Sequence, residues 1–233
     1  MLLCAWRWRA SLHLPRASPG GSLLGTGCIN SVYFAYPVVL ATFGERGLAH
    51  AILFDLGQTT LTLTILYGIA VWHGTKEATL RYALVRFISS PPLWALGISL
   101  LCSLAQWHLP TWLREVLTPV HLTTTPLASL VLGLSINFTA LRRTWPLALI
   151  GVAMRMFGGL FLGLAVAEVV HLTGMERAIV ILIAAMPSAV TAVIFAANTG
   201  LDEDLVTSIV ALSICCGVAL LPFLPHLMRL LVT

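Results

Sequence analysis

The chain has 233 residues, of which 58% are hydrophobic and 9% are charged, and its mean hydropathy is +0.94. A soluble domain of average composition carries about 25% charged residues, so this chain has too few polar side chains to cover a water-soluble globule. The same composition excludes collagen-like, disordered and disulfide-framework proteins. The formal net charge of +4 is not gathered into a basic stripe, so no nucleic-acid partner is expected. An integral membrane protein remains.

Apolar stretches long enough to cross a bilayer recur along the whole chain, since one spanning helix needs about 20 mostly apolar residues. In chain order the seven stretches are residues 22–43, 47–73, 87–107, 116–138, 144–167, 178–199 and 205–228. Only two contain a charged residue at depth, Asp55 in the second and Arg155 in the fifth. Residues 1–21 start with too short an apolar run to span, so they are expected to form a segment outside the membrane. The predicted fold class is all-α, a polytopic membrane protein with about seven transmembrane helices.

The basic residues between the stretches predict the orientation. With a cytoplasmic N-terminus, the inside segments carry Arg7, Arg9, Arg16, Lys76, Arg81, Arg86, Arg142 and Arg143, and the outside segments carry Arg46, Arg114, Arg177 and Arg229. Eight basic residues inside against four outside favour this orientation. We therefore expect residues 1–21 and 74–86 to be cytoplasmic, in a protein of the plasma (inner) membrane.

The first and sixth stretches share an interruption. Each has a proline at mid-span, Pro37 or Pro187, then small and β-branched residues, a Phe and a Gly-Leu pair. A proline inside a helix removes one backbone donor and clashes with the preceding turn. A simple proline kink explains one such helix. A matched pair instead indicates inverted repeats whose broken helices surround a site at mid-membrane depth, where half-helix amino ends attract an anion.

These segments resemble the auxin efflux carrier family, which includes bacterial organic-acid exporters. AAMPSAVTAVIFAANTGLDEDLVTSIVALS (184–213) is similar to the family's second crossover helix and the start of its last helix. INSVYFAYPVVLATFGERGLAHAILFDLG (29–57) is similar to its first crossover helix and the helix that follows, and LVLGLSINF (130–138) and Arg155 resemble its seventh and eighth helices.

The resemblance implies a shortened version of the family's architecture. Members usually have ten helices in two inverted five-helix repeats, and the seven stretches here correspond to helices four to ten, without a counterpart of the first three. It implies a helix pair over residues 22–73 with a crossover helix broken near Pro37. It further implies a second repeat over residues 87–229 with a crossover helix broken near Pro187.

Two buried charges are the leading candidates for transport chemistry. Arg155 lies about 16 Å along its span, on a face shared with Gly159 and Gly163, so it is expected to face protein or a cavity rather than lipid. It either attracts an anionic substrate or acts as a structural pin held by helix carbonyls or by Asp55. Asp55 is a candidate for proton coupling, and the alternative is a structural contact with a neighbouring helix.

The remaining site candidates are the deep amides and the residues at the breaks. With Arg155, the predicted substrate-binding residues are Asn30, Pro37, Asn137, Pro187 and Ser188. No catalytic motif and no metal-ligand spacing is present, so neither an enzyme, a metal nor a cofactor is expected.

The expected function is transport, with efflux favoured, of a small organic anion such as a carboxylate or an auxin-like acid by alternating access. Its expected partners are the lipid bilayer, that anion and, as one option, a second copy of the chain in a homodimer. Two alternatives stay open. One is a sodium-coupled symporter of the bile-acid carrier type, and the other is a fragment or subunit of a carrier that transports nothing by itself.

Overall fold

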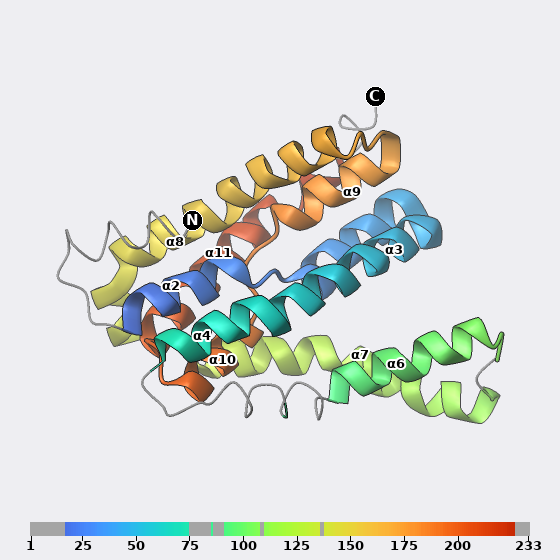
Figure 1. Ribbon diagram of the computed structural model, residues 1–233, viewed down its shortest axis with the longest axis horizontal. Helices are drawn as coiled ribbons and strands as arrows, with labels where there is room; N and C mark the ends of the chain where they lie inside the picture. Colours follow the sequence, from blue (N-terminus) through green and yellow to red (C-terminus); the bar gives the residue numbers. More distant parts are fainter. Residues whose placement is uncertain (1–16, 75–84, 86–90, 108–109, 136–137, 227–233) are drawn as a thin grey trace. The chain divides into compact units, whose positions relative to one another are not determined.

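The computed structural model describes residues 17–74, 85, 91–107, 110–135 and 138–226 (Figure 1). Throughout these residues the regular structure is helical, and the long helices are apolar. The chain divides into two compact units. One contains Met1–Glu77 and Ile136–Thr233, and the other is Ala78–Ser135, which holds α6 (Pro91–Leu104) and α7 (Thr111–Ser135). The division of the sequence into repeats is a separate question and stays a prediction.

The first unit starts with a hairpin of interrupted helices, which we call the first broken hairpin. Its elements are α2 (Ala17–Gly27), a π-helical turn η1 (Ser31–Ala35), α3 (Tyr36–Leu61), a second π-helical turn η2 (Thr62–Leu66) and α4 (Tyr67–His73). Residues 28–30 between α2 and η1 are not helical. Gly44 has φ of 66° and reverses the chain inside α3, a conformation that glycine adopts without steric strain. We call residues 31–43 the first half-helix and residues 45–73 the return helix.

The second half of this unit contains a matching arrangement. Its helices are α8 (Phe138–Val169), α9 (Gly174–Ala184), α10 (Thr191–Thr199) and α11 (Glu203–Leu220). Residues 185–190 interrupt the path from α9 to α10, and a left-handed Gly200 reverses the chain before α11. The Asp202 side chain accepts a hydrogen bond of 3.1 Å from the Leu205 N–H and so caps α11. Residues 174–220 form the second broken hairpin.

The first interruption does not lie where the proline pattern predicted it. The chain leaves the helix at residues 28–30, and Pro37 stands at the start of α3, directly after the π-helical turn η1. Pro37 follows the π-helical turn of the half-helix that begins at Ser31, and such a turn shifts the backbone register by one residue, so the missing proline N–H is accommodated without a break. The prediction of a break near Pro37 was wrong. In the second hairpin the interruption itself contains Pro187.

The amino end of α2 also differs from the expectation of a loop over residues 1–21, because Ala17–Gly21 are already helical. A Cβ on Gly20 would lie 2.7 Å from Leu201 Cδ2, and one on Gly21 would lie 3.3 Å from the Asp202 carbonyl oxygen. The glycines thus allow close packing against the turn before α11, and this tertiary contact outweighs their poor helix propensity. The rest of this segment, residues 1–16, lies outside the described residues, as does most of the predicted loop 74–86.

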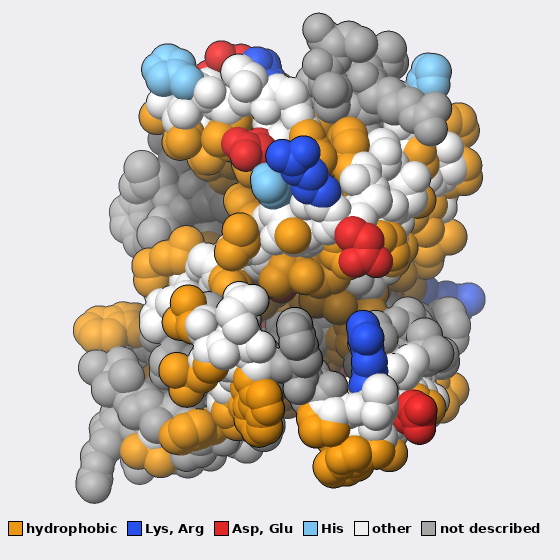
Figure 2. Space-filling model, turned by 90° about the vertical axis from the view of Figure 1, so that its right-hand side faces the viewer, with side chains coloured by type: hydrophobic (Ala, Val, Ile, Leu, Met, Phe, Trp, Pro, Cys, Tyr) orange, Lys and Arg blue, Asp and Glu red, His pale blue; other side chains and the backbone are white. Residues whose placement is uncertain are grey.

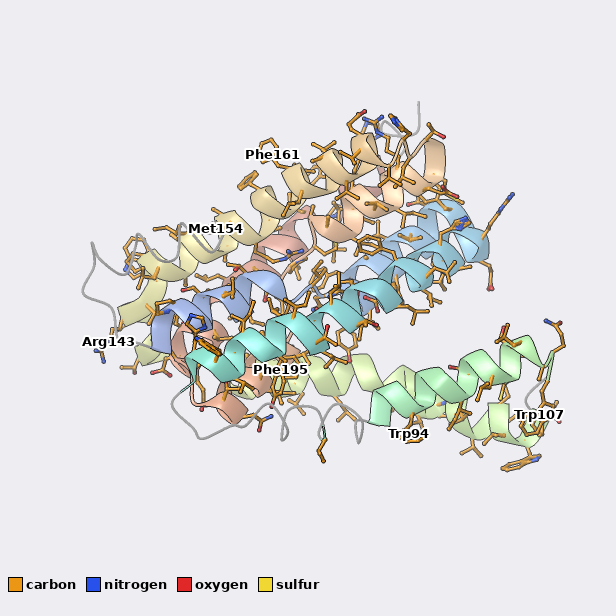
Figure 3. The ribbon with its side chains drawn as sticks, in the orientation of Figure 1. Trp94, Trp107, Arg143, Met154, Phe161 and Phe195 are labelled. Atoms are coloured by element: carbon orange, nitrogen blue, oxygen red, sulfur yellow. The ribbon has the colours of Figure 1, made fainter. Side chains whose placement is uncertain are left out.

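The chain is an all-α membrane protein. Three described helical stretches are long and apolar enough to cross a membrane: Ser31–His73, which folds back at Gly44, Leu141–Val169 and Glu203–Leu220. The other predicted spans coincide with α6 and α7 or with the two interrupted paths. Large apolar side chains point outward from the bundle, as Phe161 on α8 does with 67% of its surface exposed (Figure 3). Such a surface suits lipid and not water.

Charged side chains gather at one end of the helix bundle of the first unit (Figure 2). At this end His50 Nε2 lies 3.4 Å from a Glu176 carboxylate oxygen, and Arg177 pairs with Glu168 at 2.5 Å. The first of these pairs joins the start of the return helix to the start of α9. Between the ends the interior is apolar: the first half-helix, the return helix and α9 share one core, and α8 packs on α11 through Val152 and Ile209.

Candidate functional site

The two interruptions meet and pair with each other. Ile29 and Ser188 form an antiparallel backbone bridge. The Asn30 N–H donates to the Pro187 carbonyl at 2.9 Å, and the Ala189 N–H donates to the Cys28 carbonyl at 3.2 Å. A buried break in a helix leaves polar groups that need partners at membrane depth, and here each break supplies partners to the other. We call residues 28–30 and 185–190 together the crossing.

Asn30 closes the first half-helix at its amino end. The side chain is 4% exposed, and its Oδ1 accepts a hydrogen bond of 3.4 Å from the Tyr33 N–H. This is the position and bond of a helix N-cap. Asn30 therefore lies in the crossing, and the bond shows that it caps the half-helix. Its contact with a substrate stays a prediction.

Ser188 joins three segments of the chain. It is fully buried, its hydroxyl donates to the Gly25 carbonyl at 2.5 Å, and its backbone N–H donates to Ser213 Oγ at 3.0 Å. The Ser213 hydroxyl in turn donates to the Val210 carbonyl at 2.9 Å. Because a serine hydroxyl has one hydrogen, that of Ser188 is used to hold α2 against the crossing. Ser213 was missed from the sequence, since one serine in an apolar helix gives no sign of its partner.

Arg155 is buried and bound to the ends of the two helices that lead into the crossing. Its side chain is 4% exposed. Nε donates to the Met186 carbonyl at 3.0 Å, Nη1 to the Thr26 carbonyl at 3.3 Å and Nη2 to the Ala184 carbonyl at 2.7 Å. Thr26 and Ala184 stand at the carboxyl ends of α2 and α9, where a helix carries partial negative charge. The prediction that Arg155 faces the protein interior is confirmed, and its partners are helix carbonyls rather than Asp55.

The glycines on the same face of α8 make this contact possible. A Cβ on Gly159 would lie 2.0 Å from the Ala184 carbonyl oxygen, and one on Gly163 would lie 2.8 Å from the Ala184 Cβ. Real side chains do not approach so closely, so α8 and α9 can pack at this distance only with glycine at both positions. The close packing brings the guanidinium of Arg155 to the end of α9.

Asp55 on the return helix is held by two hydroxyl groups of the first half-helix. Ser31 Oγ donates to its Oδ1, and Tyr36 Oη donates to its Oδ2 at 3.1 Å. The carboxylate therefore binds a neighbouring segment, the contact that the structural alternative anticipated, and it lies beside the first turn after the crossing. Neither hydroxyl partner was predicted. Their positions five residues apart could have indicated a shared face only if the helix start at Ser31 had been known.

Asn137 lies outside the described residues, so its role stays a prediction. Pro37 lies beyond the crossing in the first half-helix, whereas Pro187 contributes a carbonyl to it. Among the residues that the structure describes, no group of three or more His, Cys, Asp and Glu side chains is arranged to hold a metal ion.

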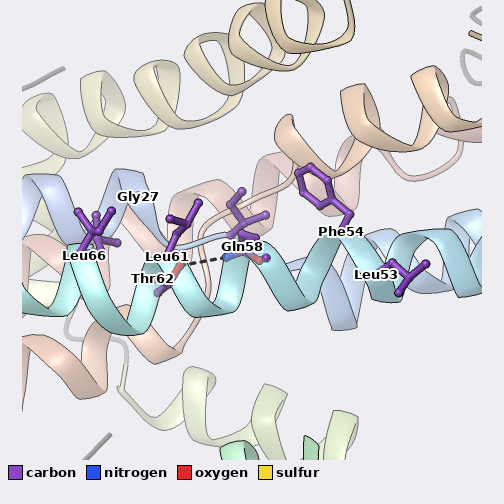
Figure 4. A pocket seen from close by; sticks show the side chains of 10 residues that line it. Gly27, Leu53, Phe54, Gln58, Leu61, Thr62 and Leu66 are labelled. Atoms are coloured by element: carbon purple, nitrogen blue, oxygen red, sulfur yellow. Dashed lines mark hydrogen bonds between the residues drawn. The ribbon is translucent and has the colours of Figure 1, made fainter. Parts of the chain in front are cut away.

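A cavity of about 630 Å³ opens beside the first interruption (Figure 4). Gly27 and Ile29 form part of its wall, and one face of the return helix forms the rest. Its lining is apolar except for an amide and a hydroxyl, Gln58 and Thr62, where Gln58 Nε2 donates to Thr62 Oγ1 at 3.2 Å. The buried Gln58 Oε1 has no hydrogen-bond partner in the structure. The lining thus suits an apolar body.

Comparison with known proteins gives the chain a family. The sequence profile of a family described as membrane transport protein matches residues 22–225. An uncharacterized transporter of Methanothermobacter thermautotrophicus is 31% identical over 219 residues, which cover 94% of this chain and 71% of that protein. An uncharacterized transporter of Methanocaldococcus jannaschii is 28% identical over 194 residues, which cover 81% of this chain and 62% of that protein, less than two thirds of its length.

No solved structure matches the chain significantly. The profile covers both interruptions, Arg155 and Asp55, so the residues of the crossing all fall inside the family region. The chain therefore belongs to the family of membrane transport proteins that includes the auxin efflux carriers, and it is an integral membrane protein.

Proposed function

We propose that this protein moves a small organic anion, such as a carboxylate, across the membrane by alternating access, with efflux as the favoured direction. The observation that carries the proposal is the crossing. Two interrupted helices from separate parts of the chain pair their non-helical backbone at one place, and each continues from there into a second half-helix. Irregular backbone inside a membrane protein is typical of ion and substrate sites in transporters.

The charge distribution around the crossing favours an anion. The first half-helix and α10 both begin at the crossing, and helix amino ends carry partial positive charge and unpaired N–H groups. Arg155 adds a full positive charge, which offsets the partial negative charge of the α2 and α9 carboxyl ends that it binds, and its three hydrogen bonds to carbonyls fix its position. In this scheme Arg155 attracts the substrate through the electrostatic field without contacting it directly.

The other predicted residues take distinct roles. Asn30 caps the first half-helix and borders the substrate, and Asn137 contributes a further amide. Pro187 and Ser188 fix the backbone of the second interruption, and Pro37 stiffens the first half-helix. Asp55 is the proton-coupling group. The N-terminus is cytoplasmic, and the protein resides in the plasma membrane, with a homodimer as one option for its assembly.

The experiment is transport by the purified protein in lipid vesicles. Efflux of radiolabelled benzoate and of succinate is compared with that from empty vesicles, with and without a sodium gradient. We expect carboxylate efflux that needs no sodium and that falls at least about tenfold in Arg155→Gln. The control Arg143→Gln alters an exposed residue at the start of α8 and should leave the flux unchanged.

Each result separates the candidate functions. Efflux that requires sodium would favour a symporter of the bile-acid carrier type. Folded protein with no flux of either anion would contradict the proposal and favour a subunit that needs other chains. Equal flux in wild type and Arg155→Gln would remove Arg155 from the mechanism.

A further inference from the structure

The carboxylate of Asp55 ties the return helix to the half-helix that starts at the crossing. Each of its two oxygens accepts one hydroxyl, from Ser31 or from Tyr36. Ser31 is 3% exposed and directly follows Asn30, whose N–H is bonded to the Pro187 carbonyl. A change at Asp55 therefore acts on the first residue of the half-helix, next to the paired backbone.

No cation competes for this carboxylate in the part of the chain that the structure describes. The ion pairs found there are His50 with Glu176 and Arg177 with Glu168. On the return helix, the nearest charged or titratable group before Asp55 is His50, which lies more than one helical turn away. On α9, which packs against α3 through apolar side chains such as Ile179 and Leu182, the charged groups Glu176 and Arg177 lie at the amino end.

The hydrogen-bond count at this cluster depends on the proton. An ionised carboxylate only accepts hydrogen bonds, and each hydroxyl has one hydrogen to give. While Asp55 is ionised, the hydrogens of Ser31 and Tyr36 are both used. A protonated carboxyl donates one hydrogen bond and offers one good acceptor fewer. One of the two hydroxyl hydrogens must then find another acceptor, because an unpaired buried donor costs about 1–3 kcal/mol.

We propose that protonation of Asp55 releases the Ser31 hydroxyl to donate to the anion bound at the crossing, so that one proton and one anion bind cooperatively. This inference rests on the proposed function and adds how a proton on Asp55 is coupled to the anion. Proton uptake adds one hydrogen to the carboxylate oxygen that faces Ser31, and the carboxyl group donates this hydrogen to Ser31 Oγ. The anion then replaces the carboxylate oxygen as acceptor for the hydroxyl hydrogen of Ser31. Tyr36, one turn further along, keeps its bond to the carboxyl group.

Cooperative binding of this kind is reciprocal. If a proton on Asp55 raises the affinity for the anion, then the bound anion must raise the affinity of the protein for a proton by the same factor. The site with one proton and one monovalent anion bound has the same net charge as the empty site with Asp55 ionised, because the two added charges cancel. Movement of the loaded site across the membrane is then less opposed by the cost of burying charge.

The test uses benzenesulfonate as the anion, because a sulfonate stays ionised over the whole range while an ordinary carboxylic acid titrates near its lower end. Its binding to the purified full chain in lipid nanodiscs is measured between about pH 5 and about pH 8, and radiolabelled benzoate efflux is measured in vesicles. In wild type we expect affinity to rise toward low pH, by up to about tenfold where Asp55 is fully protonated, a typical coupling. In Asp55→Asn we expect affinity to be the same at all pH values.

Three variants of the hydroxyl groups isolate the released donor. Ser31→Ala should lose the increase at low pH, Ser31→Thr should restore it, and Tyr36→Phe should keep it. Each variant is first checked for folding by its elution volume and helical circular dichroism. Ser31→Thr keeps the test valid if Ser31→Ala folds poorly. It retains the hydroxyl, so a normal rise in affinity at low pH in this variant depends on the hydroxyl group and not on side-chain volume alone.

The outcomes distinguish the proposed proton coupling from the anion transport on which it rests. If benzoate flux and sulfonate binding occur but the pH dependence persists in Asp55→Asn or in Ser31→Ala, the coupling is overturned and the transport proposal stands. If wild-type protein neither binds the sulfonate nor transports benzoate at any pH, both are overturned.

Discussion

The two broken hairpins of the first unit follow one plan with different chemistry. Each runs from a helix through an interruption into a half-helix, a turn with a left-handed glycine and a long helix (Figure 1). Half of the residues of α11 are buried, against 6% of the most apolar 18-residue window of Ser31–His73. The long helix of the second hairpin is thus packed in protein, whereas the first hairpin presents its return helix to the surroundings and to the cavity.

The polar bonds at the two breaks differ in the same way. Around the second break, the hydroxyl of Ser188 and the guanidinium of Arg155 donate to backbone carbonyls, and neither acceptor changes charge with pH. Around the first, the hydroxyls of Ser31 and Tyr36 donate to a carboxylate, which does change. We infer that the second hairpin is the fixed part of the site and that the first is the part that responds to a ligand or proton.

The largest expected effect comes from removing Arg155, whose hydrogen bonds hold the second hairpin in place. Arg155→Met leaves the Thr26, Ala184 and Met186 carbonyls without their donors at the centre of the bundle. Hydrogen bonds to a charged group contribute about 1.5–3 kcal/mol each, and losing all of them should lower the unfolding free energy by roughly 3–5 kcal/mol. Thermal and denaturant unfolding in detergent measure this. Arg143→Met, at an exposed position, should change stability little. Similar losses in the two variants would show that Arg155 is not a pin.

A smaller loss is expected where the fixed part packs most closely. A Cβ on Gly159 would meet the Ala184 carbonyl oxygen at 2.0 Å, so Gly159→Ala must push α8 away from α9. Overpacking of this kind costs about 1–3 kcal/mol. At Gly68, in α4, nothing lies within 4 Å of an added Cβ, and Gly68→Ala should stabilise the helix by up to about 1 kcal/mol. Melting temperatures that move in the same direction would contradict this packing.

The two serines at the breaks should separate stability from pH response. Ser188→Ala leaves the buried Gly25 carbonyl without its donor and should lower stability by about 1–2 kcal/mol without changing the pH dependence of anion binding. Ser31→Ala should lower stability less, because Asp55 keeps its bond to Tyr36, and it should abolish the pH dependence. Unfolding and sulfonate binding are measured on both variants. If Ser188→Ala and Ser31→Ala change stability and pH dependence to the same extent, the distinction between the two breaks is contradicted.

The smallest effect concerns the two prolines. Pro37 lies inside the continuous first half-helix, directly after the π-helical turn, so Pro37→Ala should change stability by less than about 0.5 kcal/mol and leave transport intact. Pro187 is buried within the second break, and its ring fills the space beside Gly217. Pro187→Ala should therefore cost more, about 1–2 kcal/mol. A larger loss of stability from Pro37→Ala than from Pro187→Ala would indicate that the first break lies at Pro37.

Apolar length and the positions of the charges were enough to predict the membrane class, and the matched segments were enough to predict the family. The same reasoning predicted that Arg155 faces inward, because the glycines on its face leave no room for lipid. It misplaced the first break, because a proline is the sequence signal for interruption and Cys28–Asn30 contain none. That break is stabilised by backbone pairing with residues 187 and 189, a long-range contact that no local pattern encodes.

The partners of Asp55 escaped prediction for a related reason. Ser31 and Tyr36 reach the carboxylate only because Gly44 folds the return helix back along the first half-helix. The sequence presented one long apolar stretch and then another, and nothing in it marked which faces would meet.

The central claim is that the two interruptions cross and pair, and a disulfide tests it most directly. In the bridge, Ile29 and Ser188 are opposite residues flanked by the two hydrogen bonds, an arrangement with Cα atoms only about 4.5 Å apart, close enough for a disulfide. The variant Ile29→Cys/Ser188→Cys is made with the five native cysteines replaced, reconstituted in lipid and treated with a mild oxidant. The account predicts that both thiols become resistant to alkylation until a reductant is added, whereas the control pair Ile29→Cys/Phe161→Cys stays reactive. Free alkylation of both thiols in the first pair would contradict it.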